Sequence, residues 1–169
     1  PRSKARPSRD SLRRIISWAA TPDLQMVFVL LAHAAATLFM VGVIWFVQIV
    51  HYPLFGRVGR SGFAAYSGDH SRLTGFVVGP PMLIEAATAV ALVVRTPQGI
   101  SPALVWAGFV LLAAIWLSTA LLQAPRHTRL GQGFDLPAHR FLVASNWLRT
   151  ALWSIRGLLV LLMLFEAMG

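Results

Sequence analysis

The chain has 169 residues, of which 56% are hydrophobic and only 12% are charged. This balance excludes an ordinary soluble domain, in which about a quarter of the residues carry charge. The sequence contains no cysteine, which excludes disulfides, thiolate metal sites and thiol redox chemistry. The formal net charge is +9, and the first segment of the chain supplies much of it.

Residues 1–22 form a basic arm with six Lys or Arg residues, and residues 11–20 within it have the apolar spacing of a short interfacial amphipathic helix. Beside a membrane span, such an arm is expected to bind anionic lipid headgroups or a partner membrane subunit, and nucleic acid is not expected. The arm favours a cytoplasmic N-terminus, which we place in a bacterial inner membrane. The sequence is also compatible with a homo-oligomer.

Four apolar runs predict an all-α, four-helix transmembrane bundle over residues 23–169, because each run approaches the roughly 20 residues that cross the bilayer core. The predicted helices cover about residues 24–50, 73–94, 102–122 and 141–165. Two long connections then lie on one side of the membrane, called side B. They share an order of residues that begins at Gln48 and Gln123, which indicates two related helical hairpins and a pseudo-twofold repeat.

Each predicted span has one polar face at helical spacing. The residues on these faces are His33, Thr37, Trp45, Gln48 and Tyr52 in the first helix, Glu85 and Thr88 in the second, Trp116, Thr119 and Gln123 in the third, and Asn146, Arg149, Trp153 and Arg156 in the fourth. Because charge is costly at mid-bilayer, these faces are expected to turn inward. The alternative is that they serve only as polar contacts between helices.

Glu85 is expected to pair with an arginine of the fourth helix. The rise of about 1.5 Å per residue places it between the depths of Arg149 and Arg156, and a guanidinium matches a carboxylate in shape and charge. In the catalytic interpretation the partner is Arg149. The other arginine would take carbonyls freed by a kink at Pro80-Pro81, or a ligand.

Four of the five histidines, His51, His70, His127 and His139, lie in or beside the predicted side-B connections. Together they are candidate ligands for a transition metal, with Asp69 and Asp135 as acceptors for their second ring nitrogens. The alternative is that each is an ordinary polar residue at the membrane boundary. Haem is disfavoured, because His33 and His51 share a helix face but lie about 27 Å apart.

Three short motifs resemble a family of small four-helix membrane proteins that includes the anthrone oxygenases of polyketide pathways. The motifs are Pro53–Phe55, Gln123-Ala-Pro-Arg-His127 with Leu130, and Asn146-Trp-Leu-Arg-Thr150. The resemblance covers most of residues 35–160. The chain departs from the family in having His127 where the oxygenases tend to have Asn, and in adding His70 and Glu85. The departure bears on the anthrone substrate more than on the fold.

The resulting hypothesis is an oxygenase-like membrane oxidoreductase acting on an apolar aromatic or quinone-like substrate. Its candidate catalytic residues are Arg149, Asn146, Glu85 and His127, and its candidate substrate-binding residues are Gln48, Gln123, Trp147, Trp153 and Arg156. The alternative is a non-catalytic accessory subunit docked through the basic arm. A transporter is a third reading, for which no residue suggests a substrate.

Overall fold

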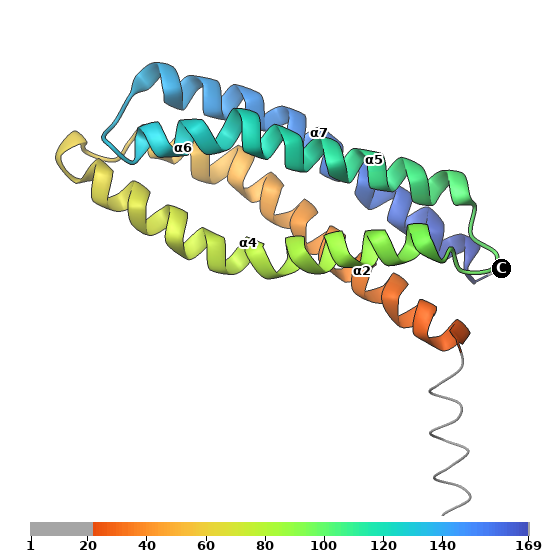
Figure 1. The fold of residues 1–169 in the computed structure, drawn as a ribbon. Helices are drawn as coiled ribbons and strands as arrows, with labels where there is room; N and C mark the ends of the chain where they lie inside the picture. The colour runs from red at the N-terminus through yellow and green to blue at the C-terminus, as the bar shows by residue number, and fades with distance from the viewer. Residues whose placement is uncertain (1–21, 169) are drawn as a thin grey trace, which may run out of the picture.

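Four long helices lie side by side in an elongated bundle (Figure 1). The computed structural model describes residues 22–168, and the predicted arm and interfacial helix at residues 1–21 lie outside them. The elements in chain order are α2 (Pro22–Phe46), η1 (Val47–His51), α3 (Tyr52–Phe55), η2 (Arg60–Gly62), α4 (Phe63–Val94), α5 (Pro102–Ser118), η3 (Thr119–Gln123), α6 (Ala124–Leu130) and α7 (Leu136–Glu166). The all-α four-helix prediction is confirmed.

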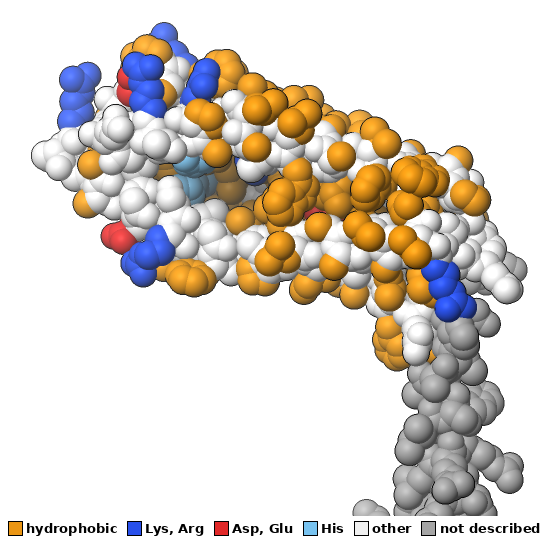
Figure 2. All heavy atoms as spheres, viewed as in Figure 1, with side chains coloured by type: hydrophobic (Ala, Val, Ile, Leu, Met, Phe, Trp, Pro, Cys, Tyr) orange, Lys and Arg blue, Asp and Glu red, His pale blue; other side chains and the backbone are white. Residues whose placement is uncertain are grey.

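Four continuous helical segments are long and apolar enough to cross a membrane. They are Leu24–Phe55, Arg60–Val94, Pro102–Leu130 and Leu136–Glu166. In Figure 2 hydrophobic side chains cover most of the length of the visible face, whereas arginines gather toward its ends. An apolar exterior of this height is what the hydrocarbon core of a bilayer requires.

The helices are longer than predicted at side B. The first and third spans continue to Phe55 and Leu130, and the second and fourth begin at Arg60 and Leu136. The two predicted long connections are therefore short loops, residues 56–59 and 131–135. As a result, the histidines expected in connections lie on helices.

The first and third spans pass through a proline at side B because each contains a π-helical segment. Proline has no backbone N–H and removes one α-helical hydrogen bond, which was the reason for predicting a helix end there. In η1 and η3 the turn widens, so that the N–H of Tyr52 donates to Val47 and that of Ala124 donates to Thr119. The proline follows two residues after each segment. Such π-helical segments are frequent at functional sites.

This shared feature relates the two hairpins in a different register from the predicted repeat. The last π-helical residues are His51 in the first hairpin and Gln123 in the second. Aligned on these segments, Gln123 corresponds to His51, which lies three residues after Gln48, where the predicted shared order begins.

Contacts between helices close the bundle into a ring. α2 packs against α4 and α7, and α5 packs against α4 and α7. Gly157 of α7 lets α2 approach closely, since a Cβ atom there would lie 3.1 Å from a methyl group of Val41. α4 bends near its middle (Figure 1), where Pro80 and Pro81 interrupt the hydrogen-bond pattern.

At side B, the loop of residues 131–135 holds the start of α7 in place. The Asp135 carboxylate accepts a hydrogen bond from the Ala138 N–H at 2.7 Å, which caps the helix, and it also pairs with Arg129 at 2.6 Å. The backbone hydrogen bond, followed by the Arg129 interactions, holds the pKa of Asp135 below its usual value.

Three buried apolar clusters follow one another along the bundle. The first includes Leu30 and Met163, the second Met40 and Trp153, and the third Phe55 and Leu142. Polar side chains are concentrated between these clusters, in two separate polar regions of the bundle interior.

Candidate functional site

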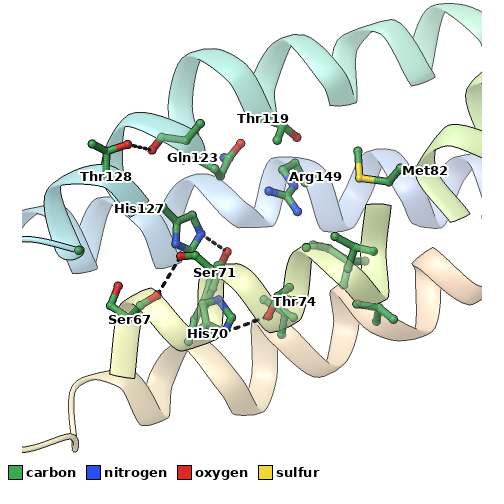
Figure 3. A pocket seen from close by; sticks show the side chains of 18 of the residues that line it. Ser67, His70, Ser71, Thr74, Met82, Thr119, Gln123, His127, Thr128 and Arg149 are labelled. Carbon is green, nitrogen blue, oxygen red and sulfur yellow. Dashed lines mark hydrogen bonds between the residues drawn. The ribbon is translucent and has the colours of Figure 1, made fainter. Parts of the chain in front are cut away.

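A cavity of about 510 Å³ lies inside the side-B half of the bundle. All four spans contribute to its lining, and most of the lining is apolar. The polar residues around it are Tyr52, Ser67, His70, Ser71, Thr74, Thr119, Gln123, His127, Thr128 and Arg149. Histidine side chains are visible in a hollow between α4 and α6 in Figure 2, and Figure 3 shows several of the lining residues from close by. The volume falls in the range of small-molecule sites in proteins.

Arg149 is the cation of this cavity. Its guanidinium carbon lies 5.3 Å from the centre of the Trp153 ring, a cation–π contact. Its buried Nε atom has no hydrogen-bond partner among the described residues. Glu85 pairs with Arg156, so the expectation that Glu85 fixes Arg149 is wrong. A guanidinium on the wall of an apolar cavity is suited to bind a carbonyl or an oxyanion.

Tyr52 and His127 form a hydrogen-bonded pair on the cavity wall. The Tyr52 hydroxyl lies 2.9 Å from His127 Nε2. The other ring nitrogen of His127, Nδ1, is buried and has no partner among the described residues. The tyrosine is carried by the turn that follows η1, and the histidine by α6, which follows η3. The two π-helical segments therefore bring this pair together.

Two further histidines continue the polar row toward α2. His51 Nε2 lies 2.8 Å from His70 Nδ1, and the two rings stack with centres 4.4 Å apart. Thr74 also contacts His70 Nδ1, at 3.0 Å. The rings of His70 and His127 stack with centres 5.7 Å apart.

Three of the four predicted histidines therefore converge, and the fourth does not. His139 is directed at the backbone, where its Nε2 lies 2.8 Å from the Tyr52 carbonyl oxygen. Within residues 22–168 no group of three His or acidic side chains is arranged to hold a metal ion. His51 and His70 are the pair whose ring nitrogens come closest together.

The predicted carboxylate partners of these histidines are used elsewhere. Asp69 forms an exposed ion pair with Arg72 at 3.1 Å, and Asp135 pairs with Arg129. Asp69 is on the exposed face of α4, one residue before His70, and successive helical residues point about 100° apart. The expectation that either aspartate orients a histidine is wrong.

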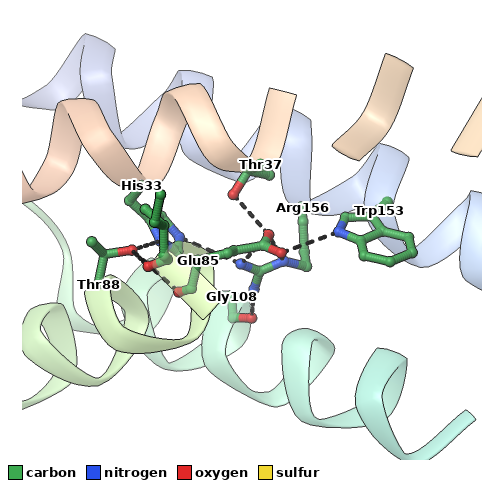
Figure 4. A network of polar contacts seen from close by, with 8 residues as sticks. His33, Thr37, Glu85, Thr88, Gly108, Trp153 and Arg156 are labelled. Atoms are coloured by element: carbon green, nitrogen blue, oxygen red, sulfur yellow. Dashed lines mark hydrogen bonds and ion pairs between the residues drawn. The ribbon is translucent and has the colours of Figure 1, made fainter. Parts of the chain in front are cut away.

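The second polar region of the bundle interior is built around an ion pair deeper in the bundle (Figure 4). Arg156 Nη2 lies 2.8 Å from Glu85 Oε1, and both side chains are fully buried. Thr37 donates to the same carboxylate at 2.8 Å and Trp153 donates at 3.3 Å. The prediction that Glu85 bridges one of the two arginines is confirmed, and the arginine is Arg156.

The remaining contacts of Arg156 come from α5 and α2. Its Nη1 donates to the carbonyl oxygen of Gly108, and its Nη2 lies 3.4 Å from His33 Nε2. His33 in turn hydrogen-bonds with Thr88 at 2.8 Å. Arg156 thus holds both the carboxylate of Glu85 and a carbonyl of α5. The arginine without the Glu85 partner, for which the sequence suggested carbonyls before Pro80-Pro81 or a ligand, is Arg149. Every polar group of this network has a partner in the bundle, which is typical of a structural contact.

Other predicted site residues occupy different positions. Asn146 donates to Gln48 at 2.8 Å, and Gln48 donates to the Val143 carbonyl. Gln123 lines the cavity and is held by Ser118 and by Ser145.

The aromatic candidates also separate. Trp153 is buried and contacts Glu85 in one polar region and Arg149 in the other. Trp147 is 47% exposed and packs edge-on against Trp45. Trp45 and Trp116 are likewise exposed, although the helical spacing placed them on polar faces.

Sequence reasoning overlooked part of the cavity. Ser67 and Thr74 line it from α4 but had been placed in a connection or a plain apolar run. The spacing of Ser67, His70, Ser71 and Thr74, at intervals of three and four residues, is a helical stripe that would have identified them. Comparison of the chain with protein-family models, with curated proteins and with solved structures finds no match.

Proposed function

We propose that this protein is an oxygenase-like oxidoreductase that acts on an apolar aromatic ketone or phenol taken from the bilayer. One observation carries the proposal. Four buried side-chain polar atoms have no partner among the described residues, and three of them belong to residues lining the same apolar cavity: Ser67 Oγ, His127 Nδ1 and Arg149 Nε. The fourth, Asn146 Oδ1, is outside the cavity lining. Buried polar atoms are rarely left unpaired, so their concentration here supports a ligand with oxygen atoms on a mainly hydrocarbon frame.

His127 is suited to act as the base. When its Nε2 carries the proton and donates to Tyr52, its Nδ1 is an acceptor without a donor among residues 22–168. A positioned imidazole typically accelerates proton transfer by 10² to 10⁴-fold. Removing a proton from a methylene that is conjugated with a ketone through aromatic rings, as in anthrone, leaves an enolate-type anion whose oxygen carries the negative charge.

Arg149 is suited to stabilise that enolate oxygen. It is the cation on the cavity wall whose charge is not matched by a carboxylate, since Glu85 is engaged with Arg156. A fixed positive group beside a developing oxyanion, in a site with little water, is a large source of catalysis.

The resemblance to anthrone oxygenases implies that O₂ is the co-substrate, and it also implies the stoichiometry of the reaction. One methylene and one molecule of O₂ give one carbonyl and one molecule of water. The methylene carbon loses four electrons, and the O₂ accepts them. One oxygen atom becomes the new carbonyl and the other leaves as water with both methylene protons.

The test is O₂ uptake by the purified protein in lipid nanodiscs with anthrone as the probe, together with the absorbance of anthraquinone. The wild-type protein is expected to exceed spontaneous oxidation, and Arg149→Ala and His127→Phe are expected to lower the excess rate by about 10²-fold or more. Arg140→Ala removes an exposed arginine of the same helix and is expected to leave the rate unchanged. Equal rates for Arg149→Ala and wild type, at equal helix content, would remove this function.

The alternative is an accessory subunit, which the six basic residues of the arm support. Purification from native membranes separates the two. A stoichiometric partner chain that is lost when the arm is removed, without any oxidation of anthrone by the complex, would favour the subunit.

A further inference from the structure

A second apolar space lies on the outer side of the bundle, between α2 and α4. It is a groove of about 610 Å³, and we call it the α2/α4 groove. Its lining residues are Leu38, Phe39, Gly42, Val43, Phe46, Val47, His51, His70, Leu73, Thr74, Val77 and Val78. Nine of the twelve are apolar, and many have large exposed fractions. The groove therefore faces the hydrocarbon of the membrane.

The groove and the cavity share a wall. Five residues line both spaces: Val43, Val47, His70, Thr74 and Val78. Only one layer of side chains separates the outside of the bundle from the space in front of Arg149. The hydrogen bond between His51 and His70 closes this layer toward side B.

The two sides of the cavity differ in chemistry. Toward α6 its edge carries hydroxyl groups, from Ser67 and Ser71 of α4 and from Thr128 of α6 (Figure 3). Toward α2 the shared wall carries three valines and two polar residues, His70 and Thr74, which hydrogen-bond each other. A hydrocarbon chain would leave the Ser67 hydroxyl unpaired on the first side, whereas the groove beyond the valines is mainly apolar.

We propose that the substrate carries a long apolar chain, alkyl or isoprenoid, and that this chain lies in the α2/α4 groove while the aromatic ring occupies the cavity. The inference rests on the proposed function, because it assigns the chain of the same substrate. The shared wall parts between Val43 and Val78 to admit the chain. The substrate class is therefore a chain-bearing aromatic ketone or phenol, dissolved in the bilayer.

The groove is expected to select substrates by their shape, and to add little to the affinity for the chain. A chain gains little by moving from lipid to an apolar protein surface, since the two environments are similarly apolar. Filling the groove is therefore expected to reject a chain-bearing substrate by steric exclusion, and to leave a bare ring unaffected.

Gly42 offers a clean way to fill the groove. It lines the groove and not the cavity, and a Cβ atom there would meet nothing within 4 Å. Gly75 is its counterpart, because it lines the cavity and not the groove and is equally open. Ala87 is an exposed residue of α4 that lines neither space.

The experiment compares anthrone with 2-decylanthrone in nanodiscs containing each variant. Gly42→Leu is expected to raise KM for the decyl compound about 10-fold or more and to leave anthrone unchanged. Gly75→Leu is expected to impair both compounds, and Ala87→Leu neither. If the wild-type protein oxidises both compounds and Gly42→Leu treats them alike, the chain does not use the groove, although the proposed function stands.

A second readout does not depend on turnover. A decylanthraquinone with a diazirine at the end of its chain is photolysed in the nanodiscs, and the labelled peptides are identified by mass spectrometry. Labels within residues 38–47 and 70–78 that excess anthraquinone suppresses support the inference. Labels mainly within residues 102–130, or labels that anthraquinone does not suppress, overturn it, whether or not the protein is active.

Discussion

The Glu85–Arg156 pair offers the sharpest test of the fold. Glu85→Ala removes a carboxylate that accepts hydrogen bonds from Thr37, from Trp153 and, through two nitrogens, from Arg156. The guanidinium left behind is 1% exposed. Isolating a buried charge in this way costs about 3–5 kcal/mol, and each of the two other orphaned donors costs about 1 kcal/mol. The expected loss in the free energy of unfolding is therefore about 5–7 kcal/mol.

The buried ion pair also leads to a prediction for a variant in which both residues are replaced. Combining Glu85→Leu with Arg156→Leu removes both charges, so that mainly the Thr37 and Trp153 donors remain unpaired. The expected loss is about 2 kcal/mol, which is smaller than the loss for Glu85→Ala. Replacing a buried ion pair by apolar residues is often nearly neutral for the same reason.

The measurement is reversible unfolding in mixed micelles with increasing dodecyl sulfate, followed by circular dichroism. Asp69→Asn is the control, because Asp69 is an exposed carboxylate on the same helix, and it is expected to change stability very little. A loss below about 1 kcal/mol for Glu85→Ala, or a double variant whose loss equals the sum of the two single ones, would refute the buried pair.

Three further outcomes are expected. Gly157→Ala should destabilise the protein, because its Cβ would lie 3.1 Å from a methyl group of α2, whereas Gly42→Ala should be neutral or stabilise by up to about 1 kcal/mol, as measured by the same unfolding assay. Tyr52→Phe leaves His127 Nε2 without its partner and should lower kcat for anthrone more than it changes KM. The folded-state pKa of Asp135 is depressed below 3.8, so its contribution to stability is present above that pH and is lost as the pH falls below it. Wild type should therefore lose more stability than Asp135→Asn between pH 5 and pH 3.

The sequence was sufficient for the bundle, because long apolar runs and the cost of charge in lipid allow few alternatives. It was also sufficient for the inward faces at His33, Thr37, Gln48 and Tyr52, all of which are buried. The estimate of depth in the membrane correctly predicted that the partner of Glu85 is an arginine of α7. It could not decide between Arg149 and Arg156, which lie two turns apart. That choice depends on the neighbours in α2 and α5, whose rotation no single-helix pattern specifies.

The sequence failed at side B, where the rule for proline led to helices that ended too early. The π-helical segments before Pro53 and Pro125 allow both helices to continue, and sequence periodicity contains no signal for a widened turn. As a consequence His51 and His127 were placed in or beside connections. His70 was placed there because α4 begins at Phe63, ten residues before the predicted start. Two of the three, His51 and His127, lie in or directly after the π-helical segments, whereas His70 lies on α4.

The central claim is that the cavity in front of Arg149 binds an aromatic molecule with oxygen substituents. Its most direct test is the binding of anthraquinone to the purified protein in nanodiscs, measured for wild type and for two glycine variants. Binding of one molecule per chain that is lost in Gly75→Leu, which fills the cavity, and kept in Gly42→Leu, which does not, is the predicted result. Equal binding by all three proteins, or none by wild type, would contradict the account.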